Sequence, residues 1–137
     1  MITGGCLCGR VRFEVDDVIA LTHCHCVICR KVSGAAFATY AHVEPTKFRF
    51  VTGENDIAQY ESSPGSHRKF CRACGSPVPS TASYLTTVSI PAGLLDDDPG
   101  VRPILHTFVA SKAPWWEIDD ELRQYARWVP GYAPKAG

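Results

Sequence analysis

The sequence has no excess of charge of either sign and no basic tail. Its 14 Lys and Arg residues balance 14 Asp and Glu residues, so the formal net charge at pH 7 is zero. Domains that bind nucleic acids usually carry a basic patch or a strongly positive field, which attracts the phosphate backbone. The even balance therefore counts against DNA or RNA as the main partner.

Long apolar runs are also missing. No segment approaches the roughly 20 apolar residues that a membrane helix needs. The N-terminus, MITGGCLCGR, has no basic region followed by an apolar stretch, as a signal peptide would. We therefore expect no membrane partner and a cytoplasmic location. Thiols stay reduced there, and the seven cysteines are an odd number, so the sequence does not predict a disulfide framework.

The chain has 11 glycines and 10 prolines, which are distributed along its whole length. The segments between them are short and rich in β-branched and aromatic residues, which is typical of short strands joined by turns. Candidate strands lie at 11–15, 37–41, 47–51, 57–61, 67–70, 86–90 and 104–109. No segment shows a clean helical period before Glu117, and the spacing of Ile118, Leu122 and Tyr125 predicts a short helix over 117–125. The pattern predicts a mainly β fold.

The seven cysteines form three groups. Two of the groups are Cys6 with Cys8, spaced C-x-C, and Cys71 with Cys74, spaced C-x-x-C. Zinc prefers four soft ligands in a tetrahedron, and a tight turn aims two sulfurs at one point. A glycine follows each of these pairs, as expected for a turn that needs a positive φ after the second ligand. Together the two pairs predict a closed, structural zinc site with four thiolates.

Cys24, Cys26 and Cys29 remain, spaced C-x-C-x-x-C. Three protein ligands and one open position are the arrangement of a catalytic zinc. The fourth position could hold water, a substrate, or a ring nitrogen of His23 or His25. Spacing alone leaves other interpretations open, namely a second structural zinc, a redox dithiol at Cys71-x-x-Cys74, and an iron–sulfur cluster.

The charge of a three-thiolate zinc site limits the reactions that the metal can promote. Zn²⁺ with three thiolates carries a formal charge of −1, so it is a weaker Lewis acid than zinc held by three neutral histidines. A soft thiol suits the open position better than a water molecule that must become hydroxide. Zinc would hold such a thiol as its nucleophilic thiolate, which favours making or breaking carbon–sulfur bonds.

Four segments in order carry a more specific pattern: GGCLCGRVRF at 4–13, HCHCVICRKVSGAAF at 23–37, FCRACGSPV at 70–78 and VASKAPWWEI at 109–118. In these segments the chain resembles the glutathione-dependent formaldehyde-activating enzyme family, whose domain is shared with centromere protein V. The resemblance implies twisted, mostly antiparallel sheets of the Mss4-like type with zinc-binding knuckles. It also implies a structural zinc on Cys6, Cys8, Cys71 and Cys74 and a catalytic zinc on Cys24, Cys26 and Cys29.

In the founding enzyme of that family, formaldehyde condenses with glutathione to give S-hydroxymethylglutathione. We therefore expect a zinc-dependent carbon–sulfur lyase whose partners are a small-molecule thiol, glutathione or a related one, and an aldehyde. The alternative is a non-enzymatic zinc-binding module that binds a partner. Arg30, directly after the open cluster, and Lys112, in the family-like SKAPWW motif, are the candidate substrate-binding residues, because a cation there could bind a substrate carboxylate.

The length of 137 residues suits one domain with its own core. No linker divides the chain. We expect a single zinc-binding domain over 1–132 and a loose C-terminal tail over 133–137.

Overall fold

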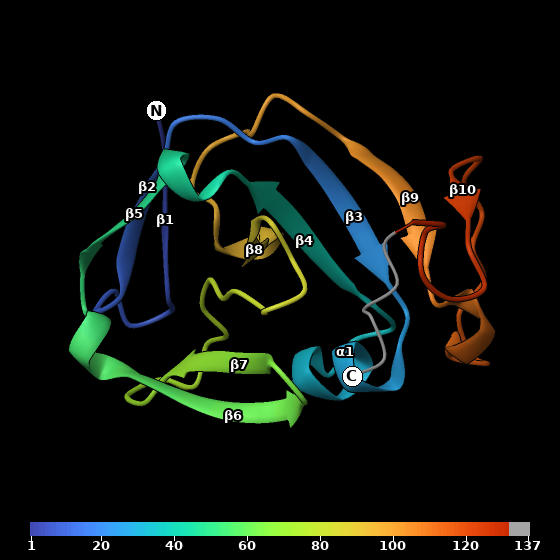
Figure 1. Ribbon diagram of the computed structural model, residues 1–137, viewed down its shortest axis with the longest axis horizontal. Coiled ribbons are helices and arrows are strands. Elements are labelled where there is room, and N and C mark those ends of the chain that lie inside the picture. Colours follow the sequence, from blue (N-terminus) through green and yellow to red (C-terminus); the bar gives the residue numbers. More distant parts are fainter. Residues whose placement is uncertain (132–137) are drawn as a thin grey trace.

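The computed structural model describes residues 1–131 and shows a mainly β fold, as the sequence predicts (Figure 1). One α-helix lies among the strands, α1 (Val27–Ser33). The strands are β1 (Ile2–Gly5), β2 (Arg12–Val15), β3 (Ala20–Cys24), β4 (Ala38–Val43), β5 (Phe48–Thr52), β6 (Ile57–Ser63), β7 (Ser66–Cys71), β8 (Val88–Pro91), β9 (Pro103–Thr107) and β10 (Arg123–Gln124). Short 3₁₀ helices lie at Pro45–Lys47, Glu54–Asp56, Ala92–Leu94 and Val109–Ser111.

The strands form three sheets. One has the order β1-β2-β5, a second has the order β10-β9-β3-β4-β8, and β6 and β7 form a two-stranded hairpin. The expectation of antiparallel pairing holds for most pairs, but β9 pairs in parallel with both β3 and β10. The chain reaches β9 by a long crossover from β3, and such a connection permits parallel pairing where a short hairpin does not.

The seven predicted strands correspond to β2 and to β4 through β9. The prediction of a helix over 117–125 is wrong, because this segment contains the short strand β10 instead. Its backbone is used for tertiary pairing: Tyr125 N donates to the His106 carbonyl at 2.9 Å. The Asp120 carboxylate accepts from Leu122 N at 3.0 Å, which fixes a turn there. Pairing with β9 thus outweighs the local helical spacing.

Helix α1 forms where the sequence predicts none, because its residues show no helical period. It has seven residues, too few to display a period, and its ends are defined by caps. The Cys26 side chain accepts from Cys29 N at 3.2 Å at the N-terminal end. Gly34, with φ 67°, ends the helix in the left-handed conformation that glycine adopts without strain.

The main core lies between the three-stranded and the five-stranded sheets. Its buried members come from both sheets and from the connection between β2 and β3, and they are Phe13, Val15, Val18, Leu21, Ala41, Val43, Val88 and Ile90. A smaller cluster of Cys6, Val11, Cys71 and Val78 joins the N-terminal hairpin to the end of β7. The second cluster therefore contains cysteines of the first and last groups.

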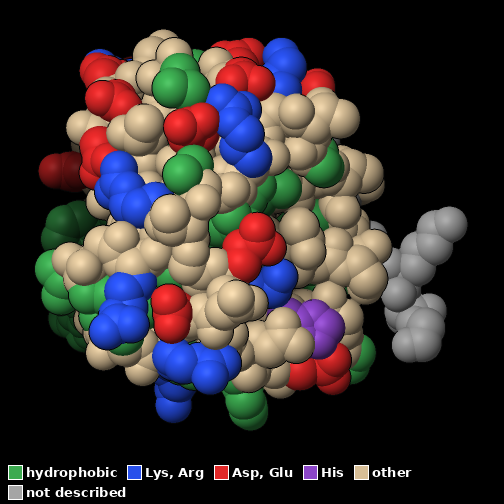
Figure 2. Space-filling model, turned by 90° about the vertical axis from the view of Figure 1, so that its left-hand side faces the viewer, with side chains coloured by type: hydrophobic (Ala, Val, Ile, Leu, Met, Phe, Trp, Pro, Cys, Tyr) green, Lys and Arg blue, Asp and Glu red, His purple; other side chains and the backbone are tan. Residues whose placement is uncertain are grey.

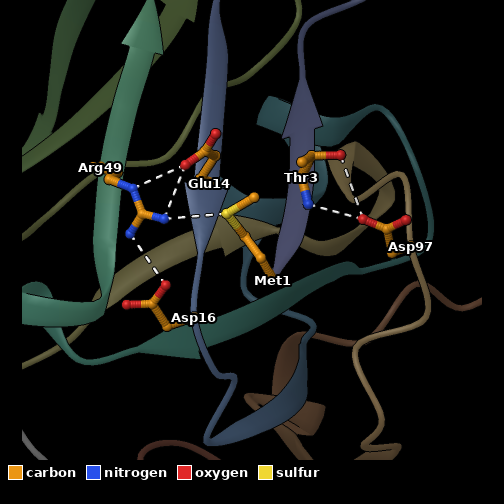
Figure 3. Close-up of polar contacts among 6 residues, drawn as sticks. All are labelled: Met1, Thr3, Glu14, Asp16, Arg49 and Asp97. Carbon is orange, nitrogen blue, oxygen red and sulfur yellow. Dashed lines mark hydrogen bonds and ion pairs between the residues drawn. The ribbon is translucent and has the colours of Figure 1, made fainter.

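The outer face of the β1-β2-β5 sheet carries charges of both signs. Figure 2, which views the molecule from that side, shows acidic and basic side chains intermixed rather than separated by sign. Arg49 bridges Glu14 at 2.9 Å and Asp16 at 3.1 Å, and Thr3 N donates to Asp97 at 2.9 Å (Figure 3). Exposed pairs of this kind contribute little to stability. Within residues 1–131, no helix has the length and apolar character needed to cross a membrane.

Candidate functional site

The first cysteine cluster joins the β1–β2 turn to the turn that follows β7. The ligand sulfurs of Cys6, Cys8, Cys71 and Cys74 all lie within 4.8 Å of one another. Sulfur–sulfur distances of 3.6 Å for Cys6–Cys8 and 3.8 Å for Cys8–Cys71 are far longer than the ~2.05 Å of a disulfide. They match the edge of about 3.8 Å that a tetrahedron with Zn–S of about 2.3 Å requires. The four sulfurs therefore fit one zinc ion.

Backbone hydrogen bonds shape this cluster. Val11 N donates to Cys6 Sγ at 3.3 Å, which favours the thiolate form. Gly9 (φ 82°) and Gly75 (φ 80°) follow the second cysteine of each pair in the left-handed region, as the spacing predicts. Gly75 N donates to the Cys71 carbonyl at 2.8 Å and closes the second knuckle. Each turn thus presents its two sulfurs on one side.

The second cluster lies where β3 ends and α1 begins. The sulfurs of Cys24, Cys26 and Cys29 lie within 4.8 Å of one another, and no fourth His, Cys, Asp or Glu in the described part of the chain joins them. Hydrogen bonds from the Cys24 and Cys29 thiols lower the pKa of Cys26, and the Cys24 pKa is raised in turn. Three soft donors fit zinc and leave one coordination position for an exogenous ligand.

His23 and His25 have other partners. His23 Nδ1 lies 2.7 Å from Thr39 Oγ1. His25 is fully buried, and its Nε2 lies 2.8 Å from His106 Nδ1. His106 Nε2 in turn lies 2.9 Å from the Asp120 carboxylate. Burial lowers the pKa of His25 to about 4, so its ring is neutral at pH 7. These contacts connect His25, between Cys24 at the end of β3 and Cys26, to β9 and to the segment that carries Asp120.

A cavity of about 260 Å³ opens beside the three-cysteine cluster. The three sulfur ligands lie at its wall, and hydroxyl side chains from several strands and loops line much of the rest. Tyr84, Phe108 and Trp128 supply aromatic wall, with the Trp128 ring centroid 5.7 Å from that of Tyr84 and 5.1 Å from that of Phe108. The open side of the cluster therefore faces a space that a small molecule can enter.

Two polar side chains contact Cys29 from this cavity. Tyr40 on β4 donates its hydroxyl to Cys29 Sγ at 3.3 Å, and burial raises the pKa of that phenol above its usual value. Arg68 on β7 donates Nη1 to the Tyr40 hydroxyl at 3.1 Å, and both of its terminal nitrogens lie 3.9 Å from Cys29 Sγ. Positive charge thus lies next to a site whose metal complex would carry a negative charge.

Arg30 and Lys112, the substrate-binding residues predicted from sequence, lie elsewhere. Arg30 Nη1 donates to the Ser111 carbonyl at 3.0 Å. Lys112 Nζ donates to the carbonyls of Ala113 and Trp116. Neither residue lines the cavity beside the cluster, so a role in substrate binding stays a prediction. Sequence reasoning missed Arg68, which follows the three cysteines by about forty positions and lies in no motif.

Comparisons with known proteins agree with this geometry. The family model described as “Glutathione-dependent formaldehyde-activating enzyme” matches residues 1–111. A protein of Halomonas elongata named “Putative glutathione-dependent formaldehyde-activating enzyme” is 29% identical over 142 residues, which cover 96% of this chain and 88% of the relative. A crystal structure of a Rhodobacter sphaeroides protein shares the fold, with 23% identity and a TM-score of 0.62 over 77% of this chain and 99% of that one. Because the family model spans most of the chain and all seven cysteines, the chain belongs to the glutathione-dependent formaldehyde-activating enzyme family.

Proposed function

We propose that the protein is a zinc-dependent carbon–sulfur lyase that joins a small-molecule thiol to an aldehyde and reverses that reaction. Glutathione and formaldehyde, with S-hydroxymethylglutathione as product, are the substrate pair suggested by the family and by the name of the Halomonas elongata relative. The observation that carries the proposal is the three-sulfur cluster that faces a cavity. The proposal includes a cytoplasmic location, where the cysteines stay reduced.

Cys24, Cys26 and Cys29 would hold the catalytic zinc, and Cys6, Cys8, Cys71 and Cys74 the structural one. When bound at the first of these sites, zinc supplies a soft Lewis acid that lowers the pKa of a thiol and favours its thiolate. In the synthetic direction, the sulfur forms a bond to the carbonyl carbon as the C=O π bond breaks. The proton of the thiol ends on the former carbonyl oxygen.

The chain's own residues prepare this step in two ways. The cavity wall encloses the reacting carbon next to the cluster, which raises the effective concentration of the two reactants. Tyr40 and Arg68 direct hydrogen-bond donors at Cys29 and so offset negative charge at the cluster. A non-enzymatic zinc module would need neither an open ligand position nor a cavity beside it, and these two features favour the enzyme.

The test is the rate at which purified, zinc-loaded protein exchanges ¹³C-formaldehyde between its free form and its glutathione adduct, followed by NMR. Exchange spectroscopy measures catalysis even though the adduct also forms without enzyme. We expect acceleration by the wild type and none by Cys26→Ser, with one zinc per chain and an unchanged far-UV spectrum in the variant. Full acceleration by Cys26→Ser, or none by wild type loaded with two zinc ions, would contradict the proposal for this substrate pair.

A further inference from the structure

The cavity beside the three-cysteine cluster contains an arginine, Arg68, that pairs with no acidic side chain in the described part of the chain. Arg12, Arg49 and Arg102 each form an ion pair with a carboxylate. Arg68 is in none of the ion pairs of residues 1–131. Among residues 1–131, no Asp or Glu lines the cavity, and Arg68 is the one arginine or lysine that does. A half-buried cation in such a wall is a site for an anion.

The Arg68 guanidinium has more N–H donors than it uses in short hydrogen bonds. Arginine carries five N–H donors. Arg68 Nε donates to Ser62 Oγ at 3.0 Å, and Nη1 donates to the Tyr40 hydroxyl at 3.1 Å. Within residues 1–131, the remaining N–H groups have only Cys29 Sγ as an acceptor, at 3.9 Å, which is the long end of the range for sulfur. These two bonds fix the orientation of the group and leave free donors for an oxyanion beside the cluster.

The volume of the cavity limits the size of the molecule that carries the anionic group. A volume of about 260 Å³ is below the ~300–1,000 Å³ of pockets that enclose drug-sized ligands. A group bound by Arg68 is also close to Cys29, so the anion and the reacting sulfur must be only a few bonds apart. A compact thiol with one carboxylate satisfies both conditions better than glutathione does, so the inference narrows the thiol class of the proposed function.

We propose that Arg68 is a specificity-determining residue that binds the carboxylate of the thiol substrate and so selects small, acidic thiols. This inference rests on the proposed function, since it assumes that the substrate sulfur binds at the three-cysteine cluster. Tyr40 and Ser62 are positioning residues, because they hold the guanidinium in place and do not themselves meet the carboxylate.

A competing explanation is that Arg68 only offsets the negative charge of the metal–thiolate complex. The two explanations differ in one measurable way. An arginine that offsets the charge of the cluster strengthens the binding of every thiolate equally, whereas a carboxylate site strengthens only thiols that carry one. The ratio of two dissociation constants within one variant separates them and cancels any general loss of stability.

The experiment uses protein loaded with Co²⁺, whose sulfur-to-metal charge-transfer band reports a thiolate that enters the open position without any need for turnover. The probes are 3-mercaptopropionate and its uncharged, nearly isosteric amide, 3-mercaptopropionamide. A charge-assisted hydrogen bond corresponds to a preference of about 10- to 100-fold, so the wild type should bind the acid that much more tightly. Arg68→Met should bring the ratio close to one, and Arg68→Lys should retain part of the preference.

Arg102→Met is the matched control, because it removes one positive charge from an exposed ion pair with Asp98 and should leave the preference unchanged. Equal affinities for acid and amide in the wild type would overturn the inference, whether or not the Arg68 variants fold. An Arg68→Met variant that binds both probes more weakly by the same factor would also overturn it, in favour of charge compensation alone. If neither probe alters the wild-type spectrum, the proposed function itself fails.

Discussion

Replacement of Cys71 by serine should remove the structural zinc and with it much of the stability of the domain. Cys71 has no exposed surface and lies in the smaller core cluster with Cys6 and Val11. Serine has nearly the same size as cysteine, so the change removes a metal ligand and creates little cavity. Its effect therefore measures the contribution of the metal rather than of packing.

The magnitude follows from the loop that the metal closes. Cys8 and Cys71 are 63 positions apart, and closing a loop of that length removes about 4 kcal/mol of unfolded-chain entropy by the relation used for disulfides. That is a large part of the ~5–15 kcal/mol by which domains are stable. At a few degrees per kcal/mol for a chain of this size, we expect Tm to fall by at least ~12 °C. Measured binding free energies of structural zinc, about 10–16 kcal/mol in peptides, make this a lower bound.

The measurement is thermal unfolding followed by far-UV circular dichroism, with zinc content determined on the same samples. Cys26→Ser is the internal comparison, because its cluster spans only residues 24–29 and its metal constrains far less of the chain. We expect Cys26→Ser to keep one zinc and most of the wild-type stability. A Cys71→Ser protein that melts within a few degrees of the wild type, or no lower than Cys26→Ser, would refute the division into structural and open sites.

Three further predictions concern the wall of the cavity, pH and the backbone. Trp128→Ala removes an aromatic wall whose ring lies 5.1 Å from that of Phe108, and it should weaken the binding of thiol probes to cobalt-loaded protein roughly 2- to 10-fold. Burial lowers the pKa of His42 below its ordinary 6.5, so the folded state binds fewer protons than the unfolded state and stability falls as pH drops below 6.5. Denaturant titrations at about pH 7.5 and pH 5.5 should therefore show a smaller loss for His42→Gln than for the wild type, and an equal loss would contradict this assignment. Both Gly53 and Gly100 have positive φ, but a Cβ would overlap the backbone, at Arg10, only at Gly53. In the same titrations we therefore expect Gly100→Ala to lower the free energy of unfolding by ~1 kcal/mol and Gly53→Ala to lower it by at least twice as much.

The grouping of the cysteines was the most predictable part of the molecule. Their geometry is set by local spacing: a C-x-C or C-x-x-C turn brings two sulfurs together whatever the rest of the chain does. The pairing of the Cys6–Cys8 and Cys71–Cys74 knuckles follows from the need for four ligands, and the structure bears it out. Strand alternation in β2 was equally local, since Phe13 and Val15 are buried while the neighbouring Glu14 is less so.

The features that sequence reasoning missed depend on contacts between distant segments. Arg68 lies on a correctly predicted strand. It reaches Cys29 because the β6–β7 hairpin packs beside α1 and β4 (Figure 1). The alternation of residues along a strand does not predict such a contact. The spacing of apolar residues over 117–125 favours a helix when the segment is considered alone, but in the fold part of it pairs with β9 instead. In both cases tertiary pairing, which is invisible to a local pattern, decided the outcome.

The two clusters also differ in when the growing chain can complete them. All three cysteines of the second cluster have been synthesised once residue 29 is added, whereas Cys6 and Cys8 must wait for Cys71 and Cys74. At about 5–20 residues per second, the interval between residues 29 and 74 lasts roughly 2 to 9 s. During that time Cys6 and Cys8 in the N-terminal hairpin lack the second cysteine pair, and their thiols can be oxidised or modified. The order of synthesis thus lets the three-cysteine cluster form first and makes the four-cysteine cluster the later of the two to form.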